Sequence, residues 1–325
     1  MIEEILPNLY RIEVPLPRNP LKTLNSYVIK AGERSLIIDT GMNREECQRK
    51  MSSSLEELGI NLNKTDFFIT HLHVDHMGLV ANLATATSNV YFNRKEASIV
   101  DSEGSERVWQ GFYKLYLSSG FPEDELKKSL ERHPGNRYGP NREIDFRTVK
   151  ENDMIEIGDY LFRCIETPGH SPGHMCLYDA AKKLLVSGDH ILFDITPNIT
   201  SWPEIKNSLK EYLTSLEKVY ALDVNLVLPG HRNIGNDHRQ RIRELQEHHQ
   251  ARANEILVAL KDGEKTAFQI APYVTWDVNY GSWELFPPQQ KWFAVGETIA
   301  HLEHLEDDGA IQRKTKGQKT VFERR

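Results

Sequence analysis

The stretch Thr70-His71-Leu72-His73-Val74-Asp75-His76 places three imidazoles and one carboxylate within a few residues. It follows Asp66-Phe67-Phe68-Ile69, an apolar run of strand length, and precedes a helix-like segment, Met77–Leu83. The polar residues are therefore expected in a loop at the carboxyl end of a strand, where α/β proteins collect functional groups. Neutral imidazole and carboxylate are the ligands that zinc and similar divalent cations prefer. The stretch therefore predicts a metal site.

Three later strand ends carry residues of the same chemistry. His170 stands in Thr167-Pro168-Gly169-His170, where proline and glycine predict a tight turn that exposes the histidine. Asp189 ends another predicted strand, and His231 ends Pro229-Gly230-His231 after a third. A solvated histidine-rich loop would not require these additional groups. Together the four strand ends supply seven candidate ligands: His71, His73, Asp75, His76, His170, Asp189 and His231.

Composition narrows the class of protein. The chain has 325 residues, 39% hydrophobic and 27% charged, which fits a soluble globular protein with one large domain and a smaller one. A net charge of -7 disfavours non-specific binding of the whole molecule to nucleic acid or to a membrane surface. The segment Met1–Pro7 predicts no secretory signal, so the cytoplasm is the expected location. The three scattered cysteines predict neither a disulfide framework nor a thiolate zinc site.

Apolar runs of strand length alternate with helical patterns through the first 235 residues, which indicates an α/β domain. Strands are expected at 9–14, 25–31, 35–39, 66–69, 89–92, 146–149, 154–157, 161–166, 175–178, 183–187 and 225–228. Helices are expected at 42–58, 77–84 and 204–222.

Residues 94–142 interrupt this alternation and are predicted to form a mostly helical insertion. Trp109, Phe112, Tyr113 and Tyr116 follow the spacing of one helical face. Two interpretations of this aromatic face stay open. It is either an ordinary buried helix face or a lid over the metal site that excludes water and binds an apolar part of a substrate.

The four motifs H-x-H-x-D-H, T-P-G-H, G-D and P-G-H, in this order and spacing, resemble the metallo-β-lactamase superfamily, most of all its glyoxalase II-like hydrolases. The resemblance covers roughly residues 8–235. It implies a four-layer αββα sandwich with the site along one edge of the two sheets. It also implies the division of the ligands: one metal would be held by His71, His73 and His170, the second by Asp75, His76 and His231, with Asp189 bridging the two.

The resemblance extends to Asp39, which stands in the family's D-T-G motif and would support the metal loop without contacting a metal. With Asp75 and Asp189 it makes up the expected catalytic carboxylates. True β-lactamases of the best-known class carry cysteine where Asp189 stands and arginine where His76 stands, so antibiotic hydrolysis is not expected. His73 replaces a glutamate of the flavodiiron proteins, which argues against a redox di-iron site. Single-iron persulfide dioxygenases share H-x-H-x-D-H and remain an alternative.

The ligand set implies two divalent metal ions, with zinc preferred and iron or manganese as alternatives. A hydroxide shared by two metals forms near neutral pH, because coordination lowers the pKa of water to about 7. We therefore expect a metal-dependent hydrolase that cleaves a small ester, thioester or lactone. Two alternatives stay open: a phosphodiesterase or endoribonuclease of the same superfamily, and a non-enzymatic regulator that binds nucleic acid.

Residues 236–325 form the second predicted domain, with helices at 237–261, 267–274 and 289–308, an irregular loop at 278–288, and a hairpin of strands 311–314 and 320–323. Helices followed by such a wing resemble the winged-helix appendage of some superfamily members. The wing is basic, but the preceding helix carries Glu297, Glu303 and Glu306, the wrong charge for a helix that faces phosphates. We therefore expect a small-molecule substrate rather than nucleic acid, and a domain that packs beside the active site or forms a homodimer contact.

The remaining histidines are not expected to hold metal. His174 begins a predicted strand and is expected to pack or to face solvent, whereas His190 is expected to have a structural role or to support the ligand Asp189 beside it. Five histidines lie in charged helical segments and are expected at the surface: His238, His248, His249, His301 and His304.

Overall fold

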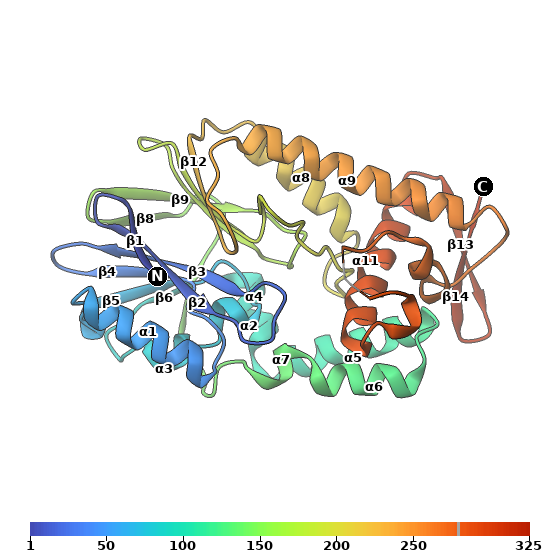
Figure 1. Ribbon diagram of the computed structural model, residues 1–325, viewed down its shortest axis with the longest axis horizontal. Coiled ribbons are helices and arrows are strands. Elements are labelled where there is room, and N and C mark those ends of the chain that lie inside the picture. Colours follow the sequence, from blue (N-terminus) through green and yellow to red (C-terminus); the bar gives the residue numbers. More distant parts are fainter. Residues whose placement is uncertain (278–279) are drawn as a thin grey trace.

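The chain forms a sandwich of two β-sheets flanked by helices, joined at one end to a mostly helical part (Figure 1). The computed structural model describes residues 1–277 and 280–325, with the side chain of Ser102 left out. The first two residues of the loop expected at 278–288 lie outside the described residues. No helix in the described part of the chain is long and apolar enough to cross a membrane.

Seven strands form the first sheet in chain order: β1 (Ile2–Leu6), β2 (Leu9–Pro15), β3 (Thr23–Lys30), β4 (Ser35–Ile38), β5 (Thr65–Phe68), β6 (Val90–Asn93) and β7 (Phe146–Val149). Strands β1 to β4 pair antiparallel, and β4 to β7 pair parallel. The short strands β4 and β5 are buried throughout, as expected for parallel strands covered on both faces.

Five strands form the second sheet in the order β12-β11-β10-β9-β8: β8 (Met154–Ile157), β9 (Tyr160–Glu166), β10 (Met175–Asp179), β11 (Leu184–Gly188) and β12 (Leu226–Pro229). Within this second sheet only β11 and β12 pair parallel, so the carboxyl ends of these two strands lie side by side. That placement brings the residues after Gly188 next to the residues after Pro229.

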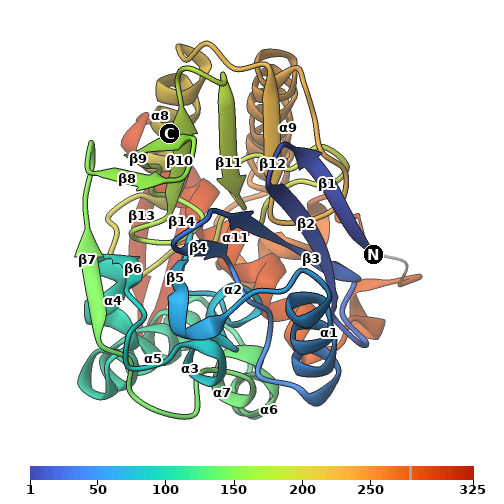
Figure 2. The same ribbon diagram turned by 90° about the vertical axis from the view of Figure 1, so that its left-hand side faces the viewer.

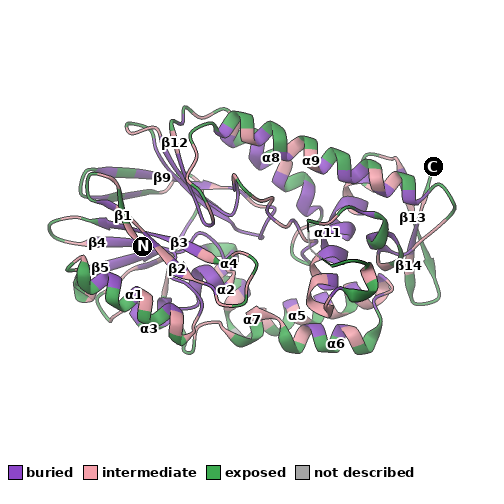
Figure 3. Ribbon diagram, viewed as in Figure 1, coloured by how far each residue is buried: buried purple, intermediate pink, exposed green. Residues whose placement is uncertain are grey.

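Three hydrophobic layers hold the sandwich together. Phe68 of the first sheet and Phe162 of the second belong to the core between the sheets. Helices α1 (Glu45–Glu57), α2 (Val74–Met77) and α3 (Val80–Leu83) cover the outer face of the first sheet, and α8 (Ser208–Tyr220) and α9 (His238–Ala259) cover the second. Figure 2 shows these layers, and Figure 3 shows the buried residues between them. The expected four-layer αββα arrangement is therefore confirmed.

The insertion and the C-terminal region share one hydrophobic core. The insertion forms α4 (Arg94–Val100), α5 (Ser102–Ser118), α6 (Glu123–Arg132) and α7 (Pro134–Arg137), and the C-terminal region adds α10 (Ala267–Ile270), α11 (Pro288–Asp307) and the hairpin β13 (Ile311–Lys316) and β14 (Lys319–Arg324). Short 3₁₀ turns lie at Leu62–Lys64, Ala271–Tyr273 and Trp283–Leu285. Tyr116 stacks on Trp292 with ring centroids 3.8 Å apart. Lys291 of α11 pairs with Glu125 of α6 at 2.9 Å.

Helix α9 joins the two parts of the molecule. Its first half packs on the second sheet through Ile242 and Leu245, and its second half enters the helical core through Ala253 and Ile256. The domain division at residue 235 stays a prediction, and the shared helical core links the insertion to the region that the sequence assigns to a second domain.

The aromatic face of the insertion mostly packs inside the helical core. Phe112 and Tyr116 are buried there. The Tyr113 hydroxyl donates to Glu123 at 2.8 Å, while Trp109 is half-buried with its ring 4.9 Å from that of His133. An ordinary helix face accounts for Phe112 and Tyr116, and a lid involving Trp109 stays a prediction.

Two local expectations differ from the structure. The edge strand β1 was not expected, because its sequence Ile-Glu-Glu-Ile-Leu lacks regular alternation of apolar and polar residues. The helix expected at 77–84 is instead two short helices, α2 and α3. Because α2 begins at Val74, Asp75 and His76 stand on a helical turn and not in the expected loop.

Candidate metal centre

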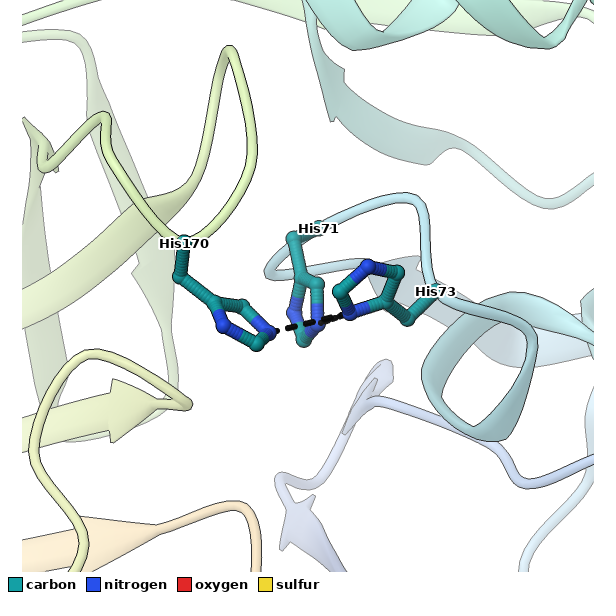
Figure 4. Close-up of side chains that lie close together, drawn as sticks. All are labelled: His71, His73 and His170. Atoms are coloured by element: carbon teal, nitrogen blue, oxygen red, sulfur yellow. Dashed lines mark hydrogen bonds between the residues drawn. The ribbon is translucent and has the colours of Figure 1, made fainter. Parts of the chain in front are cut away.

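The structure brings all seven predicted ligands together at one edge of the sandwich. Their donor atoms form three overlapping groups with mutual distances within 4.8 Å: His71, His73 and His170; His71, His76 and Asp189; and Asp75, His76 and His231. Figure 4 shows the first group, with the rings of the three histidines turned toward one another.

Strand ends from both sheets deliver these side chains. His71 and His73 follow β5, and the helical turn α2 carries Asp75 and His76. The other three ligands follow β9, β11 and β12 in the second sheet. Backbone hydrogen bonds connect these segments, with the Met175 N–H donating to the Thr70 carbonyl at 2.9 Å and the Gly230 N–H donating to the Gly188 carbonyl at 2.8 Å. The site is therefore built on the rigid ends of paired strands.

The first group consists of three neutral imidazoles around one point. His73 Nδ1 lies 2.9 Å from His71 Nε2 and 2.9 Å from His170 Nε2. Burial lowers the pKa of all three histidines, that of His73 to about 3. An imidazole without its second proton keeps a lone pair for a metal ion. The approach of three such nitrogens matches one metal-binding position.

The second group, which consists of Asp75, His76 and His231, contains one carboxylate and lies beside another, that of Asp189. Asp75 Oδ2 lies 3.5 Å from His231 Nε2, and Asp189 Oδ1 lies 3.5 Å from His76 Nε2. Burial alone would lower the pKa of His231, but Asp189 and Asp75 raise it to about 9. Burial would likewise raise the pKa of Asp75, but the neighbouring imidazoles of His231 and His76 lower it to about 2.

Asp189 lies between the two groups. Its Oδ2 is 3.6 Å from His170 Nε2 in the first group and 3.5 Å from His231 Nε2 in the second. Neighbouring histidines hold the pKa of this carboxyl well below its usual range in spite of burial. The position is the one expected of a group that contacts two adjacent cations.

Hydrogen bonds to Nδ1 fix the orientation of three imidazoles, so that Nε2 of each faces the centre. His76 Nδ1 lies 2.7 Å from Asp39 Oδ2, and the His231 and His170 Nδ1 atoms donate to the carbonyls of Thr23 at 2.7 Å and Asn198 at 2.8 Å. Asp39 also accepts the Thr70 N–H and hydroxyl, each at 2.8 Å. The Asp39 carboxylate thus holds both ends of the segment Thr70–His76, which carries four of the candidate ligands.

The donor set fits divalent cations. Among the described residues, His76 Nε2, His231 Nε2 and Asp189 Oδ1 are buried and have no hydrogen-bond partner. An unsatisfied buried polar atom destabilises a protein by about 1–3 kcal/mol, and a bound cation would satisfy all of these atoms at once. A β-carbon at Gly230 would lie 2.4 Å from Asp189 Oδ1 and 2.7 Å from His76 Cε1, so glycine leaves room for the ligands.

Two histidines beside the motifs are buried close to the ligands. His174 Nε2 accepts the Asp189 N–H at 3.1 Å, and its Nδ1 lies 2.8 Å from the Thr167 hydroxyl. The ring of His190 packs 5.3 Å from that of Tyr212. His174 thus holds the backbone of a predicted ligand, a role that the sequence did not favour for it.

Two further residues near the site were not found from the sequence. Trp202 stacks on His73 with ring centroids 6.0 Å apart and donates Nε1–H to the His170 carbonyl at 3.0 Å. Glu96 of α4 is fully buried beside the loops of the first group, and burial raises its pKa to about 7. Neither residue belongs to a recognisable motif, so the sequence offered no signal for them.

The expectation that five histidines lie at the surface is wrong for three of them, which are buried in the described structure: His238, His249 and His301. His249 Nδ1 lies 3.2 Å from His301 Nε2, where α9 packs on α11. A fourth group of candidate donors joins His248 and His249 to Glu297, but that carboxylate is paired with Arg252. Glu297 is therefore already neutralised by a guanidinium, which disfavours a cation there.

Comparisons with known proteins agree with this geometry. The sequence matches the Metallo-beta-lactamase superfamily over residues 22–231, and the Metallo-beta-lactamase-like C-terminal domain over residues 284–324. A metallo-beta-lactamase family protein of Thermus thermophilus superposes with a TM-score of 0.82 at 30% identity, covering 99% of this chain and 100% of that one.

Two curated relatives are similar over most of the chain. The probable metallo-hydrolase YqjP of Bacillus subtilis is 24% identical over 91% of this chain and 92% of its own length. The atrochrysone carboxyl ACP thioesterase of Aspergillus fumigatus is 23% identical over 79% of this chain and 69% of its own length.

The chain therefore belongs to the metallo-beta-lactamase superfamily. It is a hydrolase of that superfamily, and its fold implies a divalent-metal site at the His/Asp cluster.

Proposed function

We propose that the protein uses two divalent cations to hydrolyse a small ester, thioester or lactone. The observation that carries this proposal is the set of seven convergent His and Asp donors with three buried, unpartnered atoms among them. We propose zinc as the native metal, with iron or manganese as alternatives at a site of this donor type.

His71, His73 and His170 would hold the first cation, and Asp75, His76 and His231 would hold the second, with Asp189 touching both. When bound, two divalent cations supply a hydroxide nucleophile near neutral pH and stabilise negative charge that develops on the substrate. The chain itself orients the ligands through Asp39 and the carbonyls that anchor Nδ1 atoms.

The surroundings of His73 favour an acyl substrate. His73 is half-buried, whereas the other six candidate ligands are buried, so substrate approach is expected on its side. Its neighbours there are apolar or aromatic: Leu72 packs against the helical core, and the Trp202 ring stacks on His73 and lies 5.2 Å from the ring of Phe112. The similarity to a thioesterase supports the same substrate class.

Ion pairs in the C-terminal hairpin disfavour a nucleic-acid substrate. Arg313 pairs with Glu306 at 2.8 Å, Lys314 pairs with Glu323, and Lys316 pairs with Glu264. These pairs neutralise much of the basic charge that the hairpin shows in the sequence. A groove that tracks a phosphate backbone requires net positive charge.

A panel of thioesters, esters, lactones, phosphodiesters and RNA, assayed with metal-loaded protein, tests the proposal. We expect turnover of at least one acyl substrate and loss of turnover after chelation. Cleavage of RNA or a phosphodiester with no turnover of any acyl substrate would contradict the proposed substrate class and favour the nuclease alternative.

A further inference from the structure

We propose that Glu96 is a positioning residue of the metal centre, whose carboxyl group clamps the loop of His71 and His73 to the turn of His170. The proposal rests on the metal-dependent function above, because it concerns the three imidazoles that would hold the first cation. The hydrogen bonds of Glu96 go to two backbone N–H groups and one serine hydroxyl of the ligand loops, so it acts through those loops.

Three donors from two loops converge on this one side chain. Glu96 Oε2 accepts the backbone N–H of Leu72. Its Oε1 accepts the backbone N–H of Gly173 and the hydroxyl of Ser171, each at 2.7 Å. Leu72 separates the first two ligands, and Ser171 directly follows His170. Each loop is therefore held within one residue of a ligand.

Burial of the Glu96 carboxyl group destabilises the fold unless the group is hydrogen-bonded, which argues against a role in packing alone. Glu96 is fully buried, and none of the ion pairs among the described residues includes it. A buried carboxyl group without a cation destabilises a fold unless hydrogen bonds satisfy it. Backbone N–H groups only donate, so both oxygens serve as acceptors, one for each loop.

Residues next to Glu96 in the chain fix its position between the two loops. Asn93 ends β6 and caps α4 by accepting the Lys95 N–H at 2.7 Å, and its side-chain amide donates to Glu166 at 3.2 Å. A β-carbon at Gly173 would lie 2.7 Å from Glu96 Cγ and 2.4 Å from Asn93 Oδ1. Glycine at position 173 thus lets its N–H reach the carboxyl group, and the first turn of α4 is tied to both sheets.

Glu96→Gln tests the clamp with little change in volume. An amide keeps one acceptor oxygen and turns an NH₂ group toward the other loop, so one backbone N–H loses its acceptor. Loss of a group that orients metal ligands weakens metal affinity by about 10–100-fold. Ser171→Ala removes one donor and leaves the carboxyl group in place, so we expect a smaller change in the same direction. Glu131→Gln, at an exposed position of α6, is the matched control.

Metal-free, full-length protein is titrated with Co²⁺ in competition with a chelator, and binding is followed through the visible d–d bands of the bound ion. Thermal melts of the metal-free forms are recorded alongside. We expect weaker Co²⁺ binding and altered bands in Glu96→Gln, an intermediate effect in Ser171→Ala, and wild-type behaviour in Glu131→Gln. A melting point of metal-free Glu96→Gln close to wild type would separate positioning from loss of the fold. If Glu96→Gln does not fold, Ser171→Ala decides the question.

Wild-type Co²⁺ affinity and spectra in both Glu96→Gln and Ser171→Ala would overturn the proposal. The outcome is independent of substrate. Wild-type protein that binds Co²⁺ normally but cleaves no acyl substrate would contradict the proposed function alone, whereas unchanged variants of an active enzyme would contradict only the role of Glu96. Wild-type protein that binds no Co²⁺ would contradict both.

Discussion

Gly230→Ala should disable the second metal position while leaving the fold intact. The new β-carbon would lie 2.4 Å from Asp189 Oδ1 and 2.7 Å from His76 Cε1, where 3.4 Å is an ordinary contact. The backbone cannot move away easily, because the Gly230 N–H donates to the Gly188 carbonyl at 2.8 Å and its carbonyl accepts the Asn25 N–H at 2.7 Å. The ligand side chains must therefore shift by up to about 1 Å.

A displacement of this size is large for a metal site. A misplacement of about 1 Å in a catalytic arrangement can lower a rate by about 100-fold, and disturbing ligand orientation weakens metal binding by about 10–100-fold. We expect Gly230→Ala to bind the second cation about 10–100-fold more weakly and to lose activity by at least the same factor. Gly32→Ala is the matched control, because a β-carbon placed at Gly32 would have no atom within 4 Å.

The assay combines elemental analysis after dialysis against graded chelator with circular dichroism of the metal-free proteins. Wild-type and Gly32→Ala should keep both metals at chelator concentrations that remove one from Gly230→Ala. If folded Gly230→Ala bound both metals with wild-type affinity, His76 and Asp189 would not hold a cation in the arrangement described.

Three other changes have defined outcomes. Asp189→Ala should abolish turnover and reduce metal content while circular dichroism stays native, and unchanged activity at unchanged metal content would contradict a bridging role. Burial raises the pKa of Glu303 from 4.5 to about 7, so ionisation of this carboxyl group destabilises the fold as pH rises through that range. Glu303→Gln should therefore raise the melting temperature more at pH 8 than at pH 5. An equal shift in melting temperature at both pH values would contradict this. Trp292→Ala should lower the free energy of unfolding by about 3–5 kcal/mol in urea melts, because Trp292 is buried and stacks on Tyr116; a change below about 1 kcal/mol would contradict a core role.

Local sequence signals predicted an α/β domain and the meeting of the seven ligands, whereas the four-layer sandwich was implied by the resemblance to the superfamily. Strand-length apolar runs identify the sheets, and short polar motifs at their carboxyl ends mark the site. Asp39 was found through that resemblance, since it stands in the family's D-T-G motif. The hydrogen bond between Asp39 and His76, at 2.7 Å, follows from the pairing of β4 with β5.

The sequence did not predict which residues outside the motifs contact the ligand loops in the folded chain. Glu96 and Trp202 reach the ligand loops only after α4 and the loop before α8 pack against the sandwich, and no periodicity marks either contact. The buried His249 and His301 were missed for the same reason. Their helices carry charge on several faces, and only the packing of α9 on α11 decides which side is covered.

The central claim is that seven His and Asp side chains hold two divalent cations in one centre. Elemental analysis of wild-type protein, purified without chelator and normalised to protein concentration, tests it most directly. We predict close to two metal ions per chain. One metal ion per chain at full occupancy, unchanged after incubation with excess zinc, iron or manganese and removal of the unbound metal, would contradict the claim and the bridging position of Asp189.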